Sequence, residues 1–433
     1  MEKGLSEHTG DCYAERSGDG EVMKGGEHVK LGDAFRDKGD YDGAIAEYCE
    51  ALELNPNNVG VYLNLGAALG TIGDLDSAIT VFREALRLDP TYYHLRLNLG
   101  LALKMKGDVD SAIAEYHEAL RLNPNLAEAH IMLGDAFSDK GDWDGAIREA
   151  REALRLNPKD DGVRIDLGIA LRKKGDIDGA IAQYREYLCL HPNDDLAHYN
   201  LGVALEKNGN LCGAREEYRE ALRLNPNWVS AHHNLGVLLT NNGNWDGAIA
   251  EFREALRLNP NNDMAHNNFG FALYKKGDLE EAKTEYREAL RLNPKHAYAH
   301  FNLGTALYGN GDWDGAIAEF REALQLNPSN VKAHVYVGDA LRQKGDLAGA
   351  TVEFCKALRL DFNNELAHAG FGVVLEMKGD PQGALEECRL AYMLNPRNVL
   401  VKKYYKHVLK KTRQQSSGGG RNETPTGAEG KMV

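Results

Sequence analysis

Apolar positions follow a helical period along most of the chain. In residues 229–262, one such set is spaced i, i+3, i+4 and i+7, so its side chains share one helix face that must be buried. This set consists of His232, Leu235, Gly236 and Leu239. The pattern predicts a first helix from Val229 to Asn242.

A second helix is predicted directly after a tight turn. Gly243 is suited to the left-handed conformation that ends a helix, and Asn244 is suited to cap the next one. Pro260 ends the segment. The apolar face of the second helix carries Ala248, Phe252, Ala255 and Leu256. The segment is therefore a helix–turn–helix unit.

The same unit recurs every 34 residues without an insertion. Two glycine columns mark it, one from Gly32 to Gly372 in the first helices and one from Gly39 to Gly379 in the turns. A glycine inside a helix costs about 1 kcal/mol relative to alanine, so we expect the first column to pack closely against the small residues of the second helix. The period gives eleven units: 25–58, 59–92, 93–126, 127–160, 161–194, 195–228, 229–262, 263–296, 297–330, 331–364 and 365–398.

These columns resemble the tetratricopeptide repeat, whose pattern is a large residue, Leu-Gly, an aromatic or Leu, Ala, an aromatic, Ala and Pro. The sequence departs from that pattern locally. Ala150 replaces the second-helix aromatic in the fourth unit, Tyr187 replaces an alanine in the fifth, and Phe362 replaces the terminal proline in the tenth. Histidine takes the place of the usual tryptophan in eight units: His28, His130, His198, His232, His266, His300, His334 and His368.

The resemblance implies an all-α fold, a right-handed α-solenoid superhelix of helix–turn–helix repeats. Residues 399–412 are predicted to form a C-terminal capping helix, in which Leu400, Tyr404 and Leu409 cover the last unit while lysines face water. Residues 1–24 and 413–433 have the composition of linkers, and we predict that both segments are disordered.

Composition excludes several classes of protein. Among 433 residues, Lys+Arg number 51 and Asp+Glu number 65, which gives a net charge of −14. Such an acidic chain is a poor candidate for binding nucleic acid or an anionic membrane. No apolar stretch reaches the length of a transmembrane helix, and the first 24 residues lack the apolar core of a secretory signal. We therefore predict a soluble, cytoplasmic protein.

Three patterns invite a metal interpretation, and each has a better structural one. GDWDG at 141–145 resembles the start of a calcium loop, but its second glycine comes too early and the twelfth residue from Asp142 is Ala153. Asp142 is better explained as a helix cap. The histidines lie one unit apart, too far to share a metal, and we expect each to pack with one ring nitrogen hydrogen-bonded. The six cysteines show no regular spacing. We predict no metal and no cofactor.

No catalytic motif of the P-loop, HExxH, GxSxG or Rossmann type occurs, and the repeats occupy nearly the whole chain. We therefore predict that the protein is not an enzyme. The resemblance implies a protein–protein interaction scaffold or adaptor that binds extended peptide segments in the concave groove of the superhelix. Two alternatives stay open: a substrate-recruiting partner of a separate glycosyltransferase, and a structural solenoid that self-associates through its ends.

The resemblance places the groove on the polar face of the first helices, where an asparagine recurs. Each amide can donate and accept hydrogen bonds, so a row of them could hold a peptide backbone without reading side chains. Duplication of one ancestral unit is the other explanation for the row. The row resembles that in the repeat region of O-linked N-acetylglucosamine transferases, whose catalytic domain has no counterpart in this sequence.

The candidate peptide-binding residues are of three kinds, and we expect them to favour extended or acidic protein segments with low sequence specificity. The amides are Asn64, Asn98, Asn200, Asn234, Asn268 and Asn302; the aromatics are Tyr199, Phe271, Tyr274, Phe301 and Tyr308; the cations are Arg172, Lys173, Lys207 and Lys275.

Overall fold

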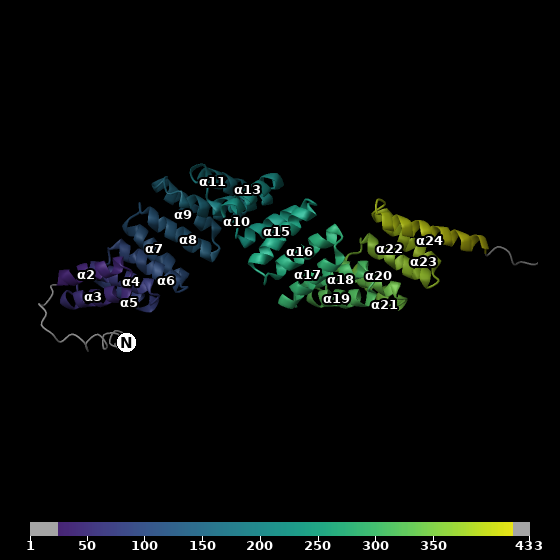
Figure 1. Ribbon diagram of the computed structural model, residues 1–433, viewed down its shortest axis with the longest axis horizontal. Coiled ribbons are helices and arrows are strands. Elements are labelled where there is room, and N and C mark those ends of the chain that lie inside the picture. Colours follow the sequence, from purple (N-terminus) through teal and green to yellow (C-terminus); the bar gives the residue numbers. More distant parts are fainter. Residues whose placement is uncertain (1–24, 419–433) are drawn as a thin grey trace, which may run out of the picture. The chain divides into compact units, whose positions relative to one another are not determined.

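The structure is a computed structural model that describes residues 25–418 (Figure 1). Over this range it consists of helices joined by short turns, and the described part of the chain contains no strand. The predicted all-α fold of paired helices is therefore confirmed. The predicted disorder of residues 1–24 and of the tail beyond 418 lies outside the described residues.

The helices follow one another in pairs, each pair a first helix and a second helix joined by a turn. The pairs are α2 (Gly25–Asp37) with α3 (Tyr41–Leu54), α4 (Val59–Thr71) with α5 (Leu75–Leu88), α6 (Tyr93–Met105) with α7 (Val109–Leu122), α8 (Ala127–Lys140) with α9 (Trp143–Leu156), α10 (Gly162–Lys174) with α11 (Ile177–Leu190), α12 (Asp195–Lys207) with α13 (Leu211–Leu224), α14 (Val229–Asn241) with α15 (Trp245–Leu258), α16 (Asp263–Lys276) with α17 (Leu279–Leu292), α18 (Ala297–Gly309) with α19 (Trp313–Leu326), α20 (Val331–Gln343) with α21 (Leu347–Leu360), and α22 (Glu365–Met377) with α23 (Pro381–Leu394).

The chain forms two compact units, residues 1–224 and residues 225–433. Helices α2–α13 belong to the first unit and α14–α23 to the second, together with a last helix, α24 (Val399–Gly418). Within each unit a first helix packs against its own second helix, and the second helix packs against the first helix of the next pair. Each unit is thus a stack in which a pair contacts mainly its neighbours.

The turn within each pair follows from two residues. Gly243 has a φ of 73°, a left-handed conformation that side chains disfavour, and this conformation ends α14. The side chain of Asn244 then accepts a hydrogen bond from the backbone N–H of Gly247 at 3.1 Å, which caps α15. Asp142 caps α9 in the same way, so the prediction that this residue is a cap is confirmed.

Removing one of these caps should weaken the chain measurably. Asp312 caps α19 by accepting a 2.9 Å hydrogen bond from Gly315 N–H, and Asp312→Ala should cost about 1 kcal/mol of unfolding free energy. Urea unfolding monitored by circular dichroism measures the loss. Asp312→Asn is the matched control, because Asn244 performs the same task in α15. Equal stabilities for the two variants would contradict this role.

Nine of the eleven glycines in the first-helix column pack against an aromatic ring of the second helix; Gly134 and Gly372 do not. A Cβ atom added to Gly236 would lie 2.8 Å from the ring of Phe252, and one added to Gly66 would lie 2.4 Å from the ring of Phe82. The prediction that alanines are the partners of these glycines was therefore wrong. A ring reaches farther across a helix pair than a methyl group does, so it fills the space that the missing Cβ leaves open.

The fourth pair is an exception that the sequence marks. Ala150 stands where nine of the other second helices carry a ring and α23 carries Cys388, and a Cβ at Gly134 would have only ordinary contacts, the nearest being Glu149 Cβ at 3.5 Å. The interface of α8 with α9 therefore has room at this glycine.

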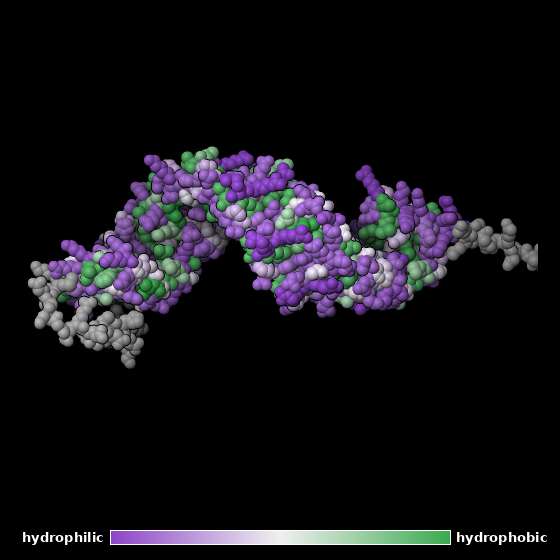
Figure 2. Space-filling view, viewed as in Figure 1, coloured by the Kyte–Doolittle hydropathy of each residue, from purple (hydrophilic) through white to green (hydrophobic). Residues whose placement is uncertain are grey.

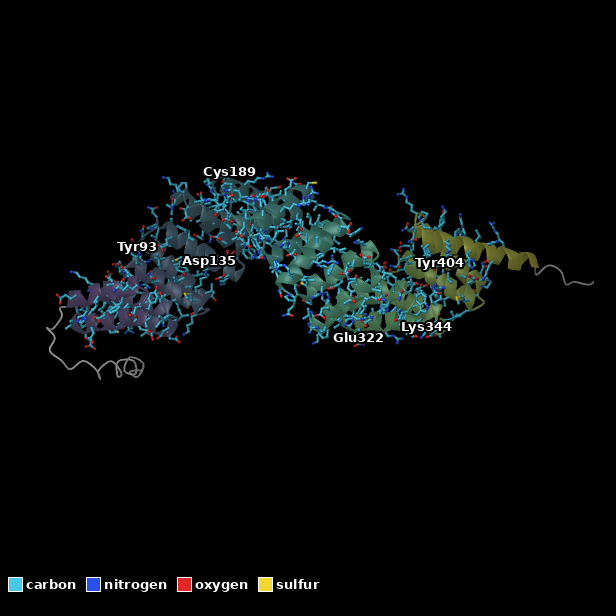
Figure 3. The ribbon with its side chains drawn as sticks, in the orientation of Figure 1. Tyr93, Asp135, Cys189, Glu322, Lys344 and Tyr404 are labelled. Carbon is cyan, nitrogen blue, oxygen red and sulfur yellow. The ribbon has the colours of Figure 1, made fainter. Side chains whose placement is uncertain are left out.

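Successive pairs are also tied by ion pairs that the sequence analysis did not predict. A lysine at the end of a first helix reaches an aspartate in the first turn of the preceding second helix. Lys140 lies 2.5 Å from Asp110, Lys276 lies 3.0 Å from Asp246, and Lys344 (Figure 3) pairs with Asp314. These pairs are exposed and screened by solvent, so each adds little to stability.

The last helix packs onto the end of the second unit. In α24, Val401 and Val408 are fully buried and Tyr405 stacks on Tyr392 of α23 at 5.1 Å between ring centroids. Leu400, predicted to cover the last repeat, stays exposed because the helix turns Val401 inward instead. The helix begins as predicted and continues past residue 412 to Gly418.

Polar residues cover much of the visible surface of both units (Figure 2). Among the helices that the structure describes, none has the length and apolar character needed to cross a membrane.

Candidate functional site

The asparagine column lies on one face of the first helices, which we call the amide face. In the second unit this face is formed by Asn234 on α14, Asn268 on α16 and Asn302 on α18, all half-buried. In the first unit the column places Asn64 on α4, Asn98 on α6 and Asn200 on α12.

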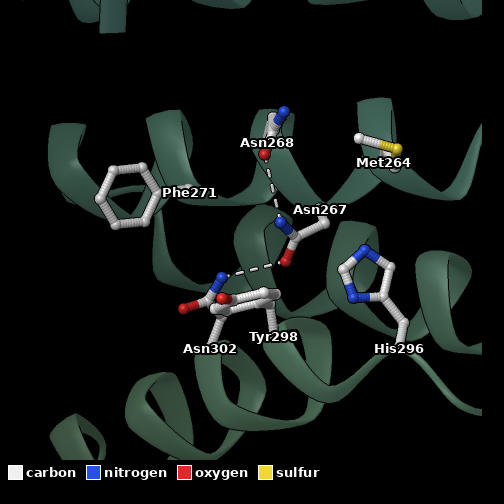
Figure 4. Close-up of a pocket in the computed structure, with 7 residues that line it drawn as sticks. All are labelled: Met264, Asn267, Asn268, Phe271, His296, Tyr298 and Asn302. Carbon is white, nitrogen blue, oxygen red and sulfur yellow. Dashed lines mark hydrogen bonds between the residues drawn. The ribbon is translucent and has the colours of Figure 1, made fainter. Parts of the chain in front are cut away.

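A chain of hydrogen bonds joins the amides of the second unit (Figure 4). Asn302 Nδ2 donates to Asn267 Oδ1 at 3.0 Å, and Asn267 Nδ2 donates to Asn268 Oδ1 at 3.2 Å. Asn268 Nδ2 in turn lies 3.4 Å from His233 Nε2. The chain crosses from α18 through α16 to α14, so it fixes the orientation of two column asparagines on adjacent first helices.

Asn267 is the link in this chain, and it is unusual for its position. Its side chain is only 8% exposed. A buried amide is costly unless its hydrogen bonds are made, and Asn267 makes them with Asn268 and Asn302. In the other repeats this position holds an apolar residue or a ring: Val29, Leu63, Leu97, Ile131, Ile165, Tyr199, His233, Phe301, Val335 and Ala369.

His233 lies at the end of this chain of hydrogen bonds, where its neutral ring acts as an acceptor. Burial lowers the pKa of its imidazole below the usual value, so the ring is uncharged at neutral pH. Its Nδ1 is buried and has no hydrogen-bond partner among the described residues. The neutral ring leaves Nε2 able to accept the hydrogen of the Asn268 amide.

A cavity of about 280 Å³ lies over this chain, between α16 and α18 (Figure 4). Its apolar wall includes Met264 and Tyr298, which are 58% and 71% exposed. No carboxylate occurs among the described residues that line it: Met264, Asn267, Asn268, Phe271, His296, Tyr298 and Asn302. The volume is near the lower end for ligand pockets and would hold about one residue of a peptide.

An aromatic cluster continues the face toward α20. Phe301 lies 5.5 Å from Phe320 and 5.8 Å from Tyr336, measured between ring centroids. Tyr308 packs edge-on to Trp313 at 5.0 Å and donates a hydrogen bond to Asp339. The ring of Tyr308 is therefore held in place.

Asp339 also accepts a 2.8 Å hydrogen bond from Arg342 Nε. Burial and the bond to Asp339 raise the pKa of Tyr308 above its usual range. Tyr308 therefore stays a neutral donor at any physiological pH.

The predicted cations differ in their surroundings. Lys275 lies over the rings of Phe271 and Tyr274, with its Nζ 5.2 Å and 5.9 Å from the ring centroids. Lys173 and Lys207 are exposed at the ends of α10 and α12. Arg172 has its Nε buried, with no hydrogen-bond partner for that atom in the described structure.

In the first unit, Asn64 and Asn98 of the asparagine column make hydrogen bonds to other groups of the protein. Asn64 Nδ2 donates to Asp33 at 3.1 Å, and Asp33 also accepts from Tyr48 at 2.7 Å. Asn98 Nδ2 donates at 2.9 Å to the carbonyl of its own helix, at His94.

Asn200 is 6% exposed, and the ring of Tyr199 lies 5.9 Å from that of Tyr218. The structure therefore brings together the candidates on α16 and α18, and does not continue the same open row through the first unit.

Sequence reasoning missed the pocket walls formed by Met264, His296 and Tyr298, and the roles of Tyr336 and Asp339. Asn267 was not among the predicted binding residues. The signal that could have found it is an amide in a column that is otherwise apolar.

Comparison with protein families supports the repeat assignment. A tetratricopeptide repeat model matches residues 97–161, 165–227, 267–330 and 303–364, which is more than half of the chain. A second model, described as TPR repeat, matches residues 32–73, 71–107 and 238–277. No curated protein matches by sequence.

Several solved structures are similar in fold. The APC/C hetero-tetramer Cut9–Hcn1 matches with 13% identity and a TM-score of 0.49 over 90% of this chain and 97% of that one. Yeast Tom70 matches with 19% identity and a TM-score of 0.40 over 90% and 96%. YrrB, described as a TPR protein with an unusual peptide-binding site, matches with 24% identity and a TM-score of 0.39 over 44% and 99%. The family assignment does not depend on these three.

Proposed function

Because the chain belongs to the tetratricopeptide repeat family, we propose that it is a protein-interaction scaffold that binds extended peptide segments along its amide face. The observation that carries the proposal is the chain of amides from Asn302 to His233. An extended peptide offers one N–H and one C=O per residue, and the amide face presents oriented groups of both kinds. Their orientation is fixed before a peptide arrives, which lowers the entropy cost of binding.

The cavity over Asn267 adds a place for one side chain of the peptide. Its walls are apolar at Met264, Phe271 and Tyr298, while its floor is made of amides. A bound side chain would therefore bury apolar area while the adjoining backbone meets Asn268 and Asn302. We propose that this is where the protein prefers a large apolar residue in its partner.

The charge around the cavity favours acidic or neutral segments. The residues that line the cavity lack a carboxylate, and Lys275 stands beside Phe271. The chain as a whole has a net charge of −14, so the positive charge of Lys275 beside the cavity is opposite in sign to the net charge of the protein. An acidic residue beside the apolar one would be attracted to Lys275.

The remaining sequence-based assignments are part of the same proposal. We propose that residues 25–398 form eleven repeats, because the helix bounds of α2–α23 keep the 34-residue period. Resemblance of the amide row to that of O-linked N-acetylglucosamine transferases, a cytoplasmic location and self-association through the array ends stay predictions. The family consists generally of non-catalytic adaptors, in keeping with a protein that is not an enzyme.

Removing the amides should weaken peptide binding without unfolding the chain. The variant replaces Asn234, Asn268 and Asn302 by alanine, and it should bind peptides at least tenfold more weakly, about 1.4 kcal/mol. The probe is an array of synthetic 15-residue peptides in acidic, neutral and basic sets, each with or without one phenylalanine. Peptides that the wild-type protein retains are then titrated by fluorescence anisotropy.

The matched control carries the same change at three exposed loop asparagines: Asn193, Asn261 and Asn363. It should bind as the wild type does. A third variant, Asn267→Val, restores the apolar residue of that column and should reduce the preference for peptides with phenylalanine. Equal affinities for all variants would refute the amide face as the binding site.

A further inference from the structure

One histidine on each of six first helices has an acceptor at both of its ring nitrogens. At His232, Nδ1 lies 2.6 Å from Glu251 Oε2, and Nε2 lies 3.0 Å from the carbonyl oxygen of Pro226. The same two contacts recur at His198, His266, His300, His334 and His368, with 2.5–2.6 Å at Nδ1 and 2.8–3.2 Å at Nε2. The sequence analysis expected one bonded nitrogen, and the structure shows two.

Two acceptors require two donors on the ring. A neutral imidazole has one N–H and one lone pair, whereas the imidazolium ion has two N–H groups. A backbone carbonyl and an ionised carboxylate only accept. A shared proton belongs on the ring and not on the glutamate, because an ordinary histidine holds its proton to a pH about two units higher than an ordinary glutamate does.

Other repeats of this chain support a cation at this place. Arg96 stands at the histidine position of its repeat, and its guanidinium lies 2.7 Å from Glu115, the counterpart of Glu251. Where the position holds Tyr62, the counterpart of the glutamate is Val81. Arg164 stands at the same position of the fifth repeat, where the counterpart of the glutamate is Gln183 and the guanidinium pairs with Glu186 instead. A cation therefore occupies this position in two further repeats, and in one of them it pairs with the counterpart glutamate.

The groups that face these rings are mainly acidic. Besides the bonded glutamate, a second carboxylate acts on several of the rings, and an arginine pairs with most of these outer carboxylates. The sets are His198 with Glu217 and Glu220, His232 with Glu251 and Glu254, His266 with Glu285 and Glu288, His300 with Glu319, His334 with Glu353, and His368 with Glu387 and Asp361. Glu353 also pairs with Lys356. The outer carboxylates that pair with an arginine form Glu220–Arg223, Glu254–Arg257 and Glu288–Arg291.

The pKa directions agree with this geometry. The hydrogen bond to Glu251 raises the pKa of His232 above its usual value, against the effect of burial. At His266 and His368 burial is the largest single effect and lowers the pKa, but the bonds to the carboxylate and the carbonyl outweigh it, and the pKa is raised. The pKa of Glu353 is lowered, because its bonds to His334 and Lys356 outweigh its burial.

We propose that His232, His266 and His368 are imidazolium ions at neutral pH and that each ties its repeat to the loop before it in a pH-dependent way. The carbonyl at Nε2 belongs to the loop that arrives from the preceding second helix, while the glutamate belongs to the following second helix. Each ring therefore bridges a junction between repeats. Loss of one proton breaks one of its two bonds, so rising pH loosens these junctions together. All three rings lie in the second unit.

Protonation of the rings can be observed directly by NMR. In protein labelled with ¹⁵N at histidine, the rings of His232, His266 and His368 should carry hydrogen on both nitrogens at pH 7.5, where a histidine of ordinary pKa is only about one-tenth protonated. His233 is the internal control beside His232, because burial lowers its pKa. His232→Asn should remove an imidazolium signal and His233→Asn a neutral one. Neutral rings at all three positions would overturn the proposal.

The link to stability is tested by unfolding at different pH values. With a raised folded-state pKa, the stabilisation is complete below the unfolded value of about 6.5 and is lost as pH rises through the folded value. The melting temperature of the wild type should therefore fall between pH 6.5 and 8.5. The fall should be smaller in a variant with Glu251→Gln, Glu285→Gln and Glu387→Gln.

The control variant changes the equivalent outer glutamates of the three repeats that have no histidine at this position, Glu84→Gln, Glu118→Gln and Glu186→Gln, and should keep the wild-type fall. The same fall in both triple variants would overturn the assignment to the His–Glu pairs. A wild-type melting temperature that does not change across this range would overturn the link to stability, whatever state the NMR signals report.

Discussion

Gly66→Ala is expected to destabilise the chain by about 1–3 kcal/mol, the usual cost of overpacking a core. The added Cβ would lie 2.4, 2.6 and 2.8 Å from three atoms of the Phe82 ring, which is itself buried. These contacts outweigh the roughly 1 kcal/mol by which alanine is favoured over glycine in a helix. Urea unfolding followed by circular dichroism measures the difference from the wild type.

The same substitution at Gly134 should change the free energy of unfolding in the opposite direction. No ring occupies this place in the fourth pair, and the nearest contact of a new Cβ is 3.5 Å. Gly134→Ala should therefore stabilise the chain, by up to about 1 kcal/mol from helix propensity alone. If both variants lose stability equally, helix packing at the ring is not the reason for the glycine column.

Phe320→Ala is expected to have the largest effect of any single truncation considered, about 3–5 kcal/mol. Phe320 is fully buried on α19, and its ring lies over Gly304 of α18 and stacks on Tyr336 of α20 at 5.3 Å between centroids. Its loss opens a cavity shared by two neighbouring pairs. Stability in a stack of repeats is partly local, so amide hydrogen exchange of α18–α21 should report the loss together with the urea midpoint.

Two further variants control this result. Tyr298→Ala removes a ring that is 71% exposed and should change stability by no more than about 0.5 kcal/mol. Phe320→Leu refills part of the cavity and should lie between the two alanine variants. An effect of Phe320→Ala no larger than that of Tyr298→Ala would show that the ring is not part of a shared core.

The fold was predictable because one period repeats through the chain. The left-handed Gly243 and the cap at Asn244 are local features, so the residues around them determine the turn. The partner of Gly236 was predicted wrongly, because spacing tells which face of a helix is buried but not which side chain of the neighbouring helix fills the space. Only the packed pair shows that this is Phe252.

The candidate site was predictable only in part. The asparagine column follows from spacing, but the bonds that orient Asn268 and Asn302 run between helices and through Asn267. The partner of His232 was missed for a similar reason. Glu251 stands 19 residues after it in a segment that reads as a solvated face, and only the close packing of α14 against α15 brings the two within 2.6 Å.

The identical turns have a consequence for how such a chain can change in length. Each second helix that the structure describes begins after the same left-handed glycine, and an Asp or Asn side chain caps these helices except α17, whose Asp278 makes no cap hydrogen bond. If one 34-residue repeat were excised between two equivalent turns, the two repeats brought together would meet through the same kind of interface that they already use. Gain or loss of whole repeats preserves the interfaces between the remaining repeats. An insertion of any other length would shift the helices out of the 34-residue register. The number of repeats is thus a variable that recombination can adjust without redesigning a core.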